Sequence, residues 1–413
     1  MKSVDKNLLG RLYVLLSFII IPFGSIGLMA RITLPDVILA GAILLLFGVK
    51  KIYNPKLGAP ALMILFFFGT AIFSLNPVTT VVEIVILLFL LFSVLVVYNV
   101  YFYNLKRLFL DISIATTASF IIGIYDFFAG NVGLPRLFPS RAAGEILSTF
   151  RNAGQAGAYV LIMLAILLPA RLSSLKNSFT LKEMRILNIG IISGVMFLLV
   201  SGKIAAYIGF FFGIFFLNIV HHNAKALMAT LILGLFLTII FLNLEHISPE
   251  LDARIQSKIE SRIVGNIDGT HDVTEEGFIA ENIKTSLESF QDNPLSGSGI
   301  GAFTEKYGDH EVHSTYFKII GEGGVLGFIG YSLFFIFLLK TIRYKPAFIV
   351  TDFQQQLIQY KKIFMPFFWG CAISWAYTYH LRKREFWIML TVILIINSFL
   401  RDPEKKDDRA IKA

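Results

Sequence analysis

The sequence is organised around a stretch that begins N-P-L-S-G-S-G-I-G-A-F at residues 293–303 and resumes H-S-T-Y-F-K-I-I-G-E-G-G-V-L-G at residues 313–327. It closes the one long hydrophilic segment of an otherwise apolar chain. It also places His313 where the next apolar run begins, so that an ionisable group there faces water and lipid headgroups together.

The glycines that punctuate this stretch include Gly297, Gly299, Gly301, Gly323, Gly324 and Gly327. The first three predict tight backbone turns, which residues carrying a Cβ resist. The last three come just inside the following apolar run, and we expect them to permit close approach between helices.

The composition is that of a membrane protein. The chain has 413 residues, of which 55% are hydrophobic and 16% charged, and its mean hydropathy is +0.70. Apolar runs of roughly 18 to 22 residues recur, enough to cross a bilayer core of about 30 Å as helices. Lipid cannot satisfy exposed backbone groups, so we expect an all-α polytopic membrane protein.

The apolar runs predict about twelve transmembrane helices, at residues 10–29, 33–49, 57–75, 81–98, 108–128, 154–172, 186–201, 204–220, 226–243, 317–339, 363–380 and 386–400. The chain then divides into helices one to nine (1–244, with a basic external loop at 130–153), a loop domain (245–316), helices ten to twelve (317–400) and a cytoplasmic tail (401–413). A long extracytoplasmic loop therefore precedes the tenth helix.

Charge sets the orientation. Cations before the first apolar run put the N-terminus in the cytoplasm, and the net charge of +9 reflects such membrane topology rather than nucleic-acid binding. One loop disagrees, because Arg382, Lys383 and Arg384 fall on the outer side in this count. Either the last two spans are misassigned or these cations meet an anionic group.

The long hydrophilic segment contains one amphipathic pattern. Residues 278–291 predict a helix that lies on the membrane surface or caps a cavity. Its apolar stripe consists of Phe278, Ile279, Ile283, Leu287 and Phe290.

Several cations gather on the predicted outer side, where the positive-inside rule expects few. The loop at 130–153 carries Arg136, Arg141 and Arg151, and Lys203 sits at the outer end of a tight hairpin. Together with His313, these residues predict one site. Each also has a plainer interpretation, as an interfacial cation on phospholipid headgroups or, for His313, a helix-start histidine.

At these residues the sequence resembles the O-antigen ligase and polymerase family of bacterial envelope glycosyltransferases. The external loop and the hairpin match the family pattern at Arg141, Gly144, Phe150, Asn152, Ser201, Gly202 and Lys203. The later block matches at Asn293, Pro294, Leu295, Gly297, Gly299, His313, Glu322, Gly324 and Gly327.

Two departures from the family pattern stand out. Lys203 replaces an arginine at the hairpin, and the arginine of the loop helix has no clear counterpart, so Lys284 or Arg262 is the substitute.

The resemblance implies a GT-C-like helical bundle in the bacterial inner membrane with its active site facing the periplasm. It implies transfer of a glycan from undecaprenyl diphosphate to an acceptor hydroxyl, with inversion and without a metal or other cofactor. A ligase uses lipid A-core as acceptor, whereas a polymerase uses a second lipid-linked glycan. We favour the ligase.

The residue types suit this chemistry. Arg141 and Arg151 are candidates to hold the diphosphate through the bidentate guanidinium fork, with Lys203 as a point charge. His313 is the candidate base for the acceptor hydroxyl, although it could instead orient the acceptor or contact phosphate. Glu322 is a candidate acceptor or loop contact, or a partner for Lys318 four residues earlier.

Three other interpretations remain open at the level of sequence. His310 and His313 with adjacent acids form a weak metal-site pattern, because a third well-spaced ligand is lacking. A transporter of lipid-linked sugars would place polar groups near the bilayer midplane rather than at one face. A scaffold without chemistry leaves the external cations unexplained.

Overall fold

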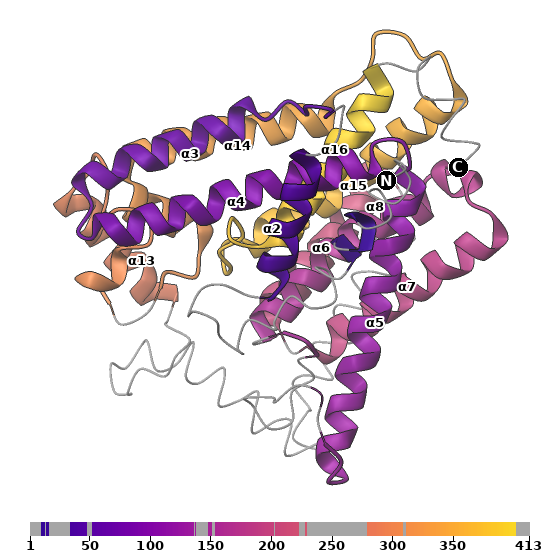
Figure 1. Cartoon of the computed structure of the whole chain (residues 1–413), viewed down its shortest axis with the longest axis horizontal. Coiled ribbons are helices and arrows are strands. Elements are labelled where there is room, and N and C mark those ends of the chain that lie inside the picture. Colours follow the sequence, from indigo (N-terminus) through magenta and orange to yellow (C-terminus); the bar gives the residue numbers. More distant parts are fainter. Residues whose placement is uncertain are drawn as a thin grey trace.

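The computed structural model describes residues 10–12, 14–15, 34–47, 52–135, 137, 148–150, 153–201, 203–222, 228, 279–308 and 311–401. Across these residues the regular structure is helical and contains no β-strand (Figure 1). The long helices are α2 (Leu34–Phe47), α3 (Gly58–Thr70), α4 (Pro77–Tyr101), α5 (Leu105–Asn131), α6 (Ala153–Leu172), α7 (Leu181–Val200), α8 (Ile204–Val220), α13 (Ile279–Asp292), α14 (Thr315–Arg343), α15 (Asp352–Ser374) and α16 (Arg384–Arg401). Short 3₁₀ turns cover Ala71–Phe73, Ser174–Ser178 and Phe303–Glu305.

Five of the described helices are long and apolar enough to cross a membrane: Pro77–Tyr101, Leu105–Ala129, Gly154–Leu172, Leu181–Val200 and Thr315–Arg343. This confirms the all-α membrane protein predicted from composition. The total of twelve spans stays a prediction, and the predicted spans at 10–29 and 226–243 lie largely outside the described residues.

Helix starts follow capping residues rather than the edges of the apolar runs. α4 begins four residues before the predicted span, where Asn76 accepts a hydrogen bond from the Thr79 backbone at 3.2 Å and Pro77 occupies the first helical position. α5 begins early in the same way, because Asn104 caps the Arg107 backbone.

The predicted span at 363–380 is wrong at both ends. α15 begins at Asp352, where Thr351 and Gln354 form a capping box. Its first turns are polar, yet Gln354 and Lys361 are buried against protein, which a hydropathy pattern cannot anticipate. Residues 375–383 form a loop instead of the end of a span.

Small residues bring the helices together. A Cβ on Gly370 of α15 would lie 2.1 Å from the Gly209 carbonyl oxygen of α8, so these two backbones touch. A Cβ on Gly330 of α14 would lie 2.7 Å from Phe66 of α3, and Figure 1 shows α3 and α14 running side by side. Close approach of this kind is how helices pack inside a membrane.

The amphipathic helix expected at 278–291 is present as α13, and small residues form its contact with α14. Ser286 and Ser289 are the buried residues, whereas Leu287 is 43% exposed. The reason is Gly321 of α14, whose absent side chain lets the Ser286 backbone approach so closely that a Cβ would lie 2.9 Å away. Only small residues fit that contact. Phe278 lies outside the described residues.

Candidate functional site

The glycine-rich turn is locked onto α14 by reciprocal backbone hydrogen bonds. The Ser298 and Gly299 N–H groups donate to the carbonyls of Gly321 and Glu322 at 3.0 and 2.9 Å. In return, the N–H groups of Val325 and Leu326 donate to the carbonyls of Pro294 and Leu295 at 2.9 and 3.0 Å. The two blocks of the sequence motif therefore form one structural unit.

This exchange depends on a break in α14 at Gly324, whose φ is +56° and ψ is −151°. That conformation interrupts the helical ladder and frees the carbonyls that the turn uses. The expectation that Gly324 serves helix approach is therefore wrong. Gly321 and Gly330 serve that purpose, whereas Gly324 provides the break.

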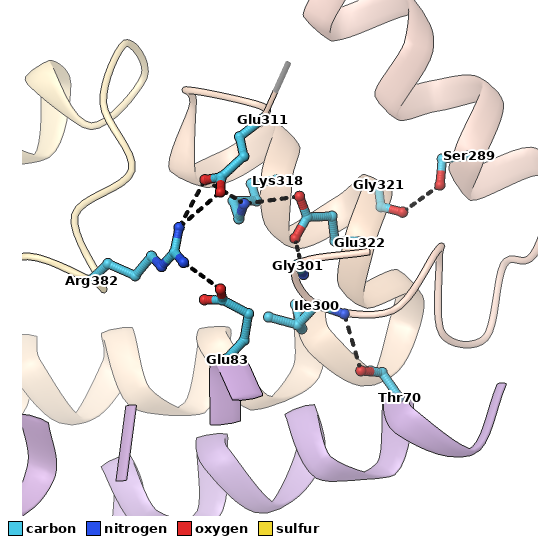
Figure 2. A network of polar contacts seen from close by, with 10 residues as sticks. All are labelled: Thr70, Glu83, Ser289, Ile300, Gly301, Glu311, Lys318, Gly321, Glu322 and Arg382. Carbon is cyan, nitrogen blue, oxygen red and sulfur yellow. Dashed lines mark hydrogen bonds and ion pairs between the residues drawn. The ribbon is translucent and has the colours of Figure 1, made fainter. Parts of the chain in front are cut away.

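A network of charged side chains lies beside this turn (Figure 2). Lys318, fully buried, is 2.9 Å from a Glu322 carboxylate oxygen and 3.6 Å from one of Glu311. The other oxygen of Glu322 accepts the Gly301 N–H at 2.6 Å. Glu322 thus couples the charge network to the glycine turn, and the predicted pairing of Glu322 with Lys318 is present.

Arg382 completes the network from the loop after α15. One guanidinium nitrogen donates to both oxygens of Glu311, at 3.0 and 2.9 Å, and the other donates to Glu83 of α4. Figure 2 shows Arg382 lying between these two acids. Its hydrogen-bonding capacity is directed at carboxylates, so Arg382 holds the segment that carries Glu311.

The loop that carries Arg382 is pinned to the start of α14. The Thr315 backbone donates to the Trp375 carbonyl at 2.9 Å, and its hydroxyl donates to the Thr378 carbonyl at 2.8 Å. The His380 ring stacks on Trp375 with centroids 3.8 Å apart. These contacts fix where the loop, and with it Arg382, can lie.

Sequence reasoning did not assign Arg382 to the site, although the signal was there. The cations at 382–384 broke the positive-inside pattern, and one of the two explanations was an anionic partner. The structure supplies protein carboxylates as that partner: Glu83 and Glu311 for Arg382, and Asp36 for Arg384.

His313 stands two residues after Glu311 in an extended segment. Side-chain exposure alternates there, with Glu311 and His313 exposed and Val312 and Ser314 buried. Partial desolvation lowers the pKa of His313, and the nearby charge of Lys203 lowers it further, against an opposing effect of Glu311. The lowered pKa favours the neutral form of this exposed imidazole over the protonated form.

Lys203 immediately precedes α8 and packs against α6. A Cβ on Gly157 of α6 would lie 2.6 Å from the Lys203 Cβ, so a glycine is required beside it. The charge of Lys203 contributes to the lowered pKa of His313, after desolvation. Of the sequence-predicted residues, the structure brings Lys203, His313 and Glu322 to one end of the bundle.

The remaining predicted residues fare differently. Arg141, Arg151 and Arg262 lie outside the described residues, as do Arg136 and His310. Lys284 projects from α13 with 78% of its side chain exposed and lies 4.0 Å from Glu288. Glu322 is fully buried, so it makes a loop contact rather than an exposed acceptor contact.

No three histidine, cysteine or acidic side chains of the described residues come together in a group that could hold a metal ion. The acids of the charge network instead face Lys318 and Arg382. Among the described residues, the arrangement offers the exposed imidazole of His313 and the cation of Lys203 at the end of the bundle that carries the charge network.

A comparison with protein-family models matches the part of the chain that contains most of this site. Residues 189–332 match the family model of the O-antigen ligases. The resemblance inferred from the motifs is confirmed over this segment. The family covers ligases and polymerases, which are glycosyltransferase-like enzymes of O-antigen assembly that act on lipid-linked glycans. No curated protein matches the sequence.

The O-antigen ligase segment contains Lys203, His313, Lys318 and Glu322, together with the glycine turn. Arg382 lies outside it, as does its partner Glu83. The charge network thus ties this segment to α4, which precedes it in the sequence, and to the loop between α15 and α16, which follows it.

Proposed function

We propose that this protein is an O-antigen ligase that transfers a glycan from undecaprenyl diphosphate to a hydroxyl of lipid A-core on the periplasmic face of the bacterial inner membrane. The observation that carries the proposal is the position of His313. It is an exposed imidazole just before α14, with a pKa lowered by desolvation and by the charge of Lys203, within the segment that matches the O-antigen ligases.

The reaction requires a base and a cationic site. The acceptor hydroxyl attacks the anomeric carbon while the bond from that carbon to the diphosphate oxygen breaks. His313 takes the hydroxyl proton, and inversion follows from attack opposite the leaving group. The lipid diphosphate departs with the bonding electron pair, and Lys203 together with Arg141 and Arg151 stabilises its charge without a metal.

The network of charged side chains holds the segment that carries His313. Arg382 and Lys318 both contact Glu311, two residues before His313, and Ser314 immediately after it caps α14. We assign Arg382, Lys318 and Glu322 to positioning, because their charged groups face one another. Positioning of a reacting group to within an ångström can change a rate by about 10²-fold.

The test is turnover by the purified protein in liposomes, given an undecaprenyl-diphosphate glycan with or without lipid A-core. We expect transfer to lipid A-core that is lost in His313→Ala and Arg141→Ala. It should persist in His221→Ala, which removes an exposed histidine at the far end of α8. Retained transfer in His313→Ala would remove that residue from catalysis.

The same assay separates the alternatives. Chain growth on the carrier without lipid A-core would make the protein a polymerase, which is the other activity of the family. If the folded parent released no carrier diphosphate under any condition, transport of a lipid-linked sugar would replace transfer as the proposal.

A further inference from the structure

A cavity of about 710 Å³ lies at the end of the bundle opposite His313. The last turns of α8, the end of α14 with the two residues after it, and the middle of α15 line it. Lys203 immediately precedes α8, whose 17 residues separate it by about 25 Å from the last turn of α8 at the cavity. The cavity therefore belongs to neither the charge network nor the proposed transfer site.

The wall of the cavity is apolar. α8 contributes Phe216 and Ile219, and α15 contributes Ile358, Met365 and Trp369. From Lys362 at the mouth to Trp369 the wall extends about 10 Å along α15. Such a wall fits a hydrocarbon chain rather than a soluble polar ligand.

The mouth is basic. Arg343, Lys345 and Lys362 line the cavity and are exposed, and none of them forms an ion pair with another described residue. Among the described lining residues there is no acid. Three cations around an apolar cavity match the chemistry of a lipid phosphate.

Lys361 also lines the cavity but serves the fold. Its ammonium donates to the carbonyls of Thr341 and Tyr344 at 3.1 and 2.6 Å and to the Asn397 amide oxygen at 2.5 Å. All three N–H groups are thereby used, so the ligand would meet the other three cations.

A second feature places this mouth at the level of lipid headgroups. Phe348, Ile349 and Val350, in the connection from α14 to α15, are 83%, 55% and 67% exposed. Exposed apolar side chains within a few residues of exposed cations are typical of a segment at the membrane interface. The occupant available at that level is a membrane lipid.

We propose that this cavity binds an anionic phospholipid. The lipid phosphate lies against Arg343, Lys345 and Lys362, and one acyl chain follows the α15 wall toward Trp369. This site is independent of the transfer reaction.

Trp369 provides a direct readout. Of the three tryptophans of the chain, Trp375 and Trp387 are buried at 2% and 0% exposure, whereas Trp369 lines the cavity. Full-length protein in detergent micelles is titrated with phosphatidylglycerol carrying brominated acyl chains, and with brominated phosphatidylcholine of the same chains. We expect saturable quenching by phosphatidylglycerol at lower concentration, absent in Trp369→Phe.

Two variants test the mouth and the wall separately. Arg343→Gln with Lys362→Gln should weaken phosphatidylglycerol binding about 25-fold, about fivefold for each cation lost. The matched control, Lys182→Gln with Arg185→Gln, removes two exposed cations elsewhere and should bind as the parent does. Ile219→Phe with Met365→Phe keeps the cations, fills the wall and should weaken both lipids.

Equal quenching by the two lipids would overturn the proposal, as would equal weakening in the matched control, which would show general surface charge. Unchanged binding when the wall is filled would place the lipid elsewhere. Thermal unfolding of each variant establishes that it is folded.

Discussion

Two buried lysines near opposite ends of α14 show how differently the two ends of the bundle handle charge. Lys318, in the first turns, faces the carboxylates of Glu322 and Glu311 at 2.9 and 3.6 Å. Lys361 faces two carbonyls of the last turn and the Asn397 amide. The ammonium of Lys318 is paired with negatively charged carboxylates, whereas the ammonium of Lys361 is stabilised by neutral carbonyl dipoles at a helix C-terminus.

The difference matches what each end is proposed to do. At the His313 end, acids and bases bind one another and fix the backbone around the reacting group. At the Lys361 end the helix terminus is satisfied internally, which leaves Arg343, Lys345 and Lys362 exposed at the cavity mouth. Ion pairs between buried side chains hold the backbone in place, whereas exposed cations can bind an anionic ligand.

The largest expected effect comes from removing these lysines one at a time. Lys318→Met leaves Glu322 buried and without its cation, which should cost about 3–5 kcal/mol of unfolding free energy. Lys361→Met leaves only neutral acceptors and should cost about 1–3 kcal/mol. Thermal unfolding in detergent measures which variant loses more stability. A larger loss in Lys361→Met than in Lys318→Met would contradict the difference proposed between the two ends.

A double variant sharpens that result. Lys318→Met with Glu322→Leu removes both buried charges and should recover much of the stability lost in Lys318→Met. If the double variant is no more stable than the single one, packing rather than unbalanced charge explains the loss.

The glycine turn gives the next largest effect. Gly297 has a φ of +60°, and a Cβ there would lie 2.2 Å from the Gly321 carbonyl oxygen. Gly297→Ala should therefore cost about 2–3 kcal/mol, through strain and overpacking, and should lower turnover because the turn contacts Glu322. Gly58→Ala is the control, since nothing lies within 4 Å of its added Cβ. Unfolding and turnover are measured on both.

Arg382 tests whether the network positions His313. Arg382→Gln should cost about 1–2 kcal/mol, less than Lys318→Met because this side chain is 23% exposed. It should lower kcat more than it raises KM, since Glu311 and the His313 segment lose an anchor. Arg382→Lys keeps the charge without the bidentate fork and should restore part of the activity. Equal loss in both variants would favour a purely structural role.

The smallest effect concerns pH. His313 acts as a base above its pKa, so activity falls as pH drops through that pKa. Lys203 lowers the pKa of His313, so Lys203→Gln should move the acid limb of the kcat/KM profile to higher pH. Lys362→Gln, at the other end of the bundle, should leave the limb unmoved. If the acid limb of Lys203→Gln lay at the same pH as in the parent, the charge of Lys203 would have no effect on the pKa of His313.

Much of the His313 end could be predicted because its signals are local. The glycine spacing predicts turns, the i, i+4 relation predicts the Lys318–Glu322 pair, and the pattern at 278–291 predicts α13. The packed face of α13 could not be predicted, because a serine contact with Gly321 decides it. A hydrophobic stripe describes affinity for apolar surroundings, not which surface is near.

The sequence by itself determined the membrane class, most described helices and the residues of the His313 motif, because hydropathy, capping and turn formation act over a few neighbouring residues. Only the tertiary structure decided that α15 begins in a polar segment, that Arg382 joins Glu83 and Glu311, and that three cations surround an apolar cavity. Each depends on residues far apart in the chain. Burial and charge pairing are set by whatever lies across the contact, which the local sequence does not specify.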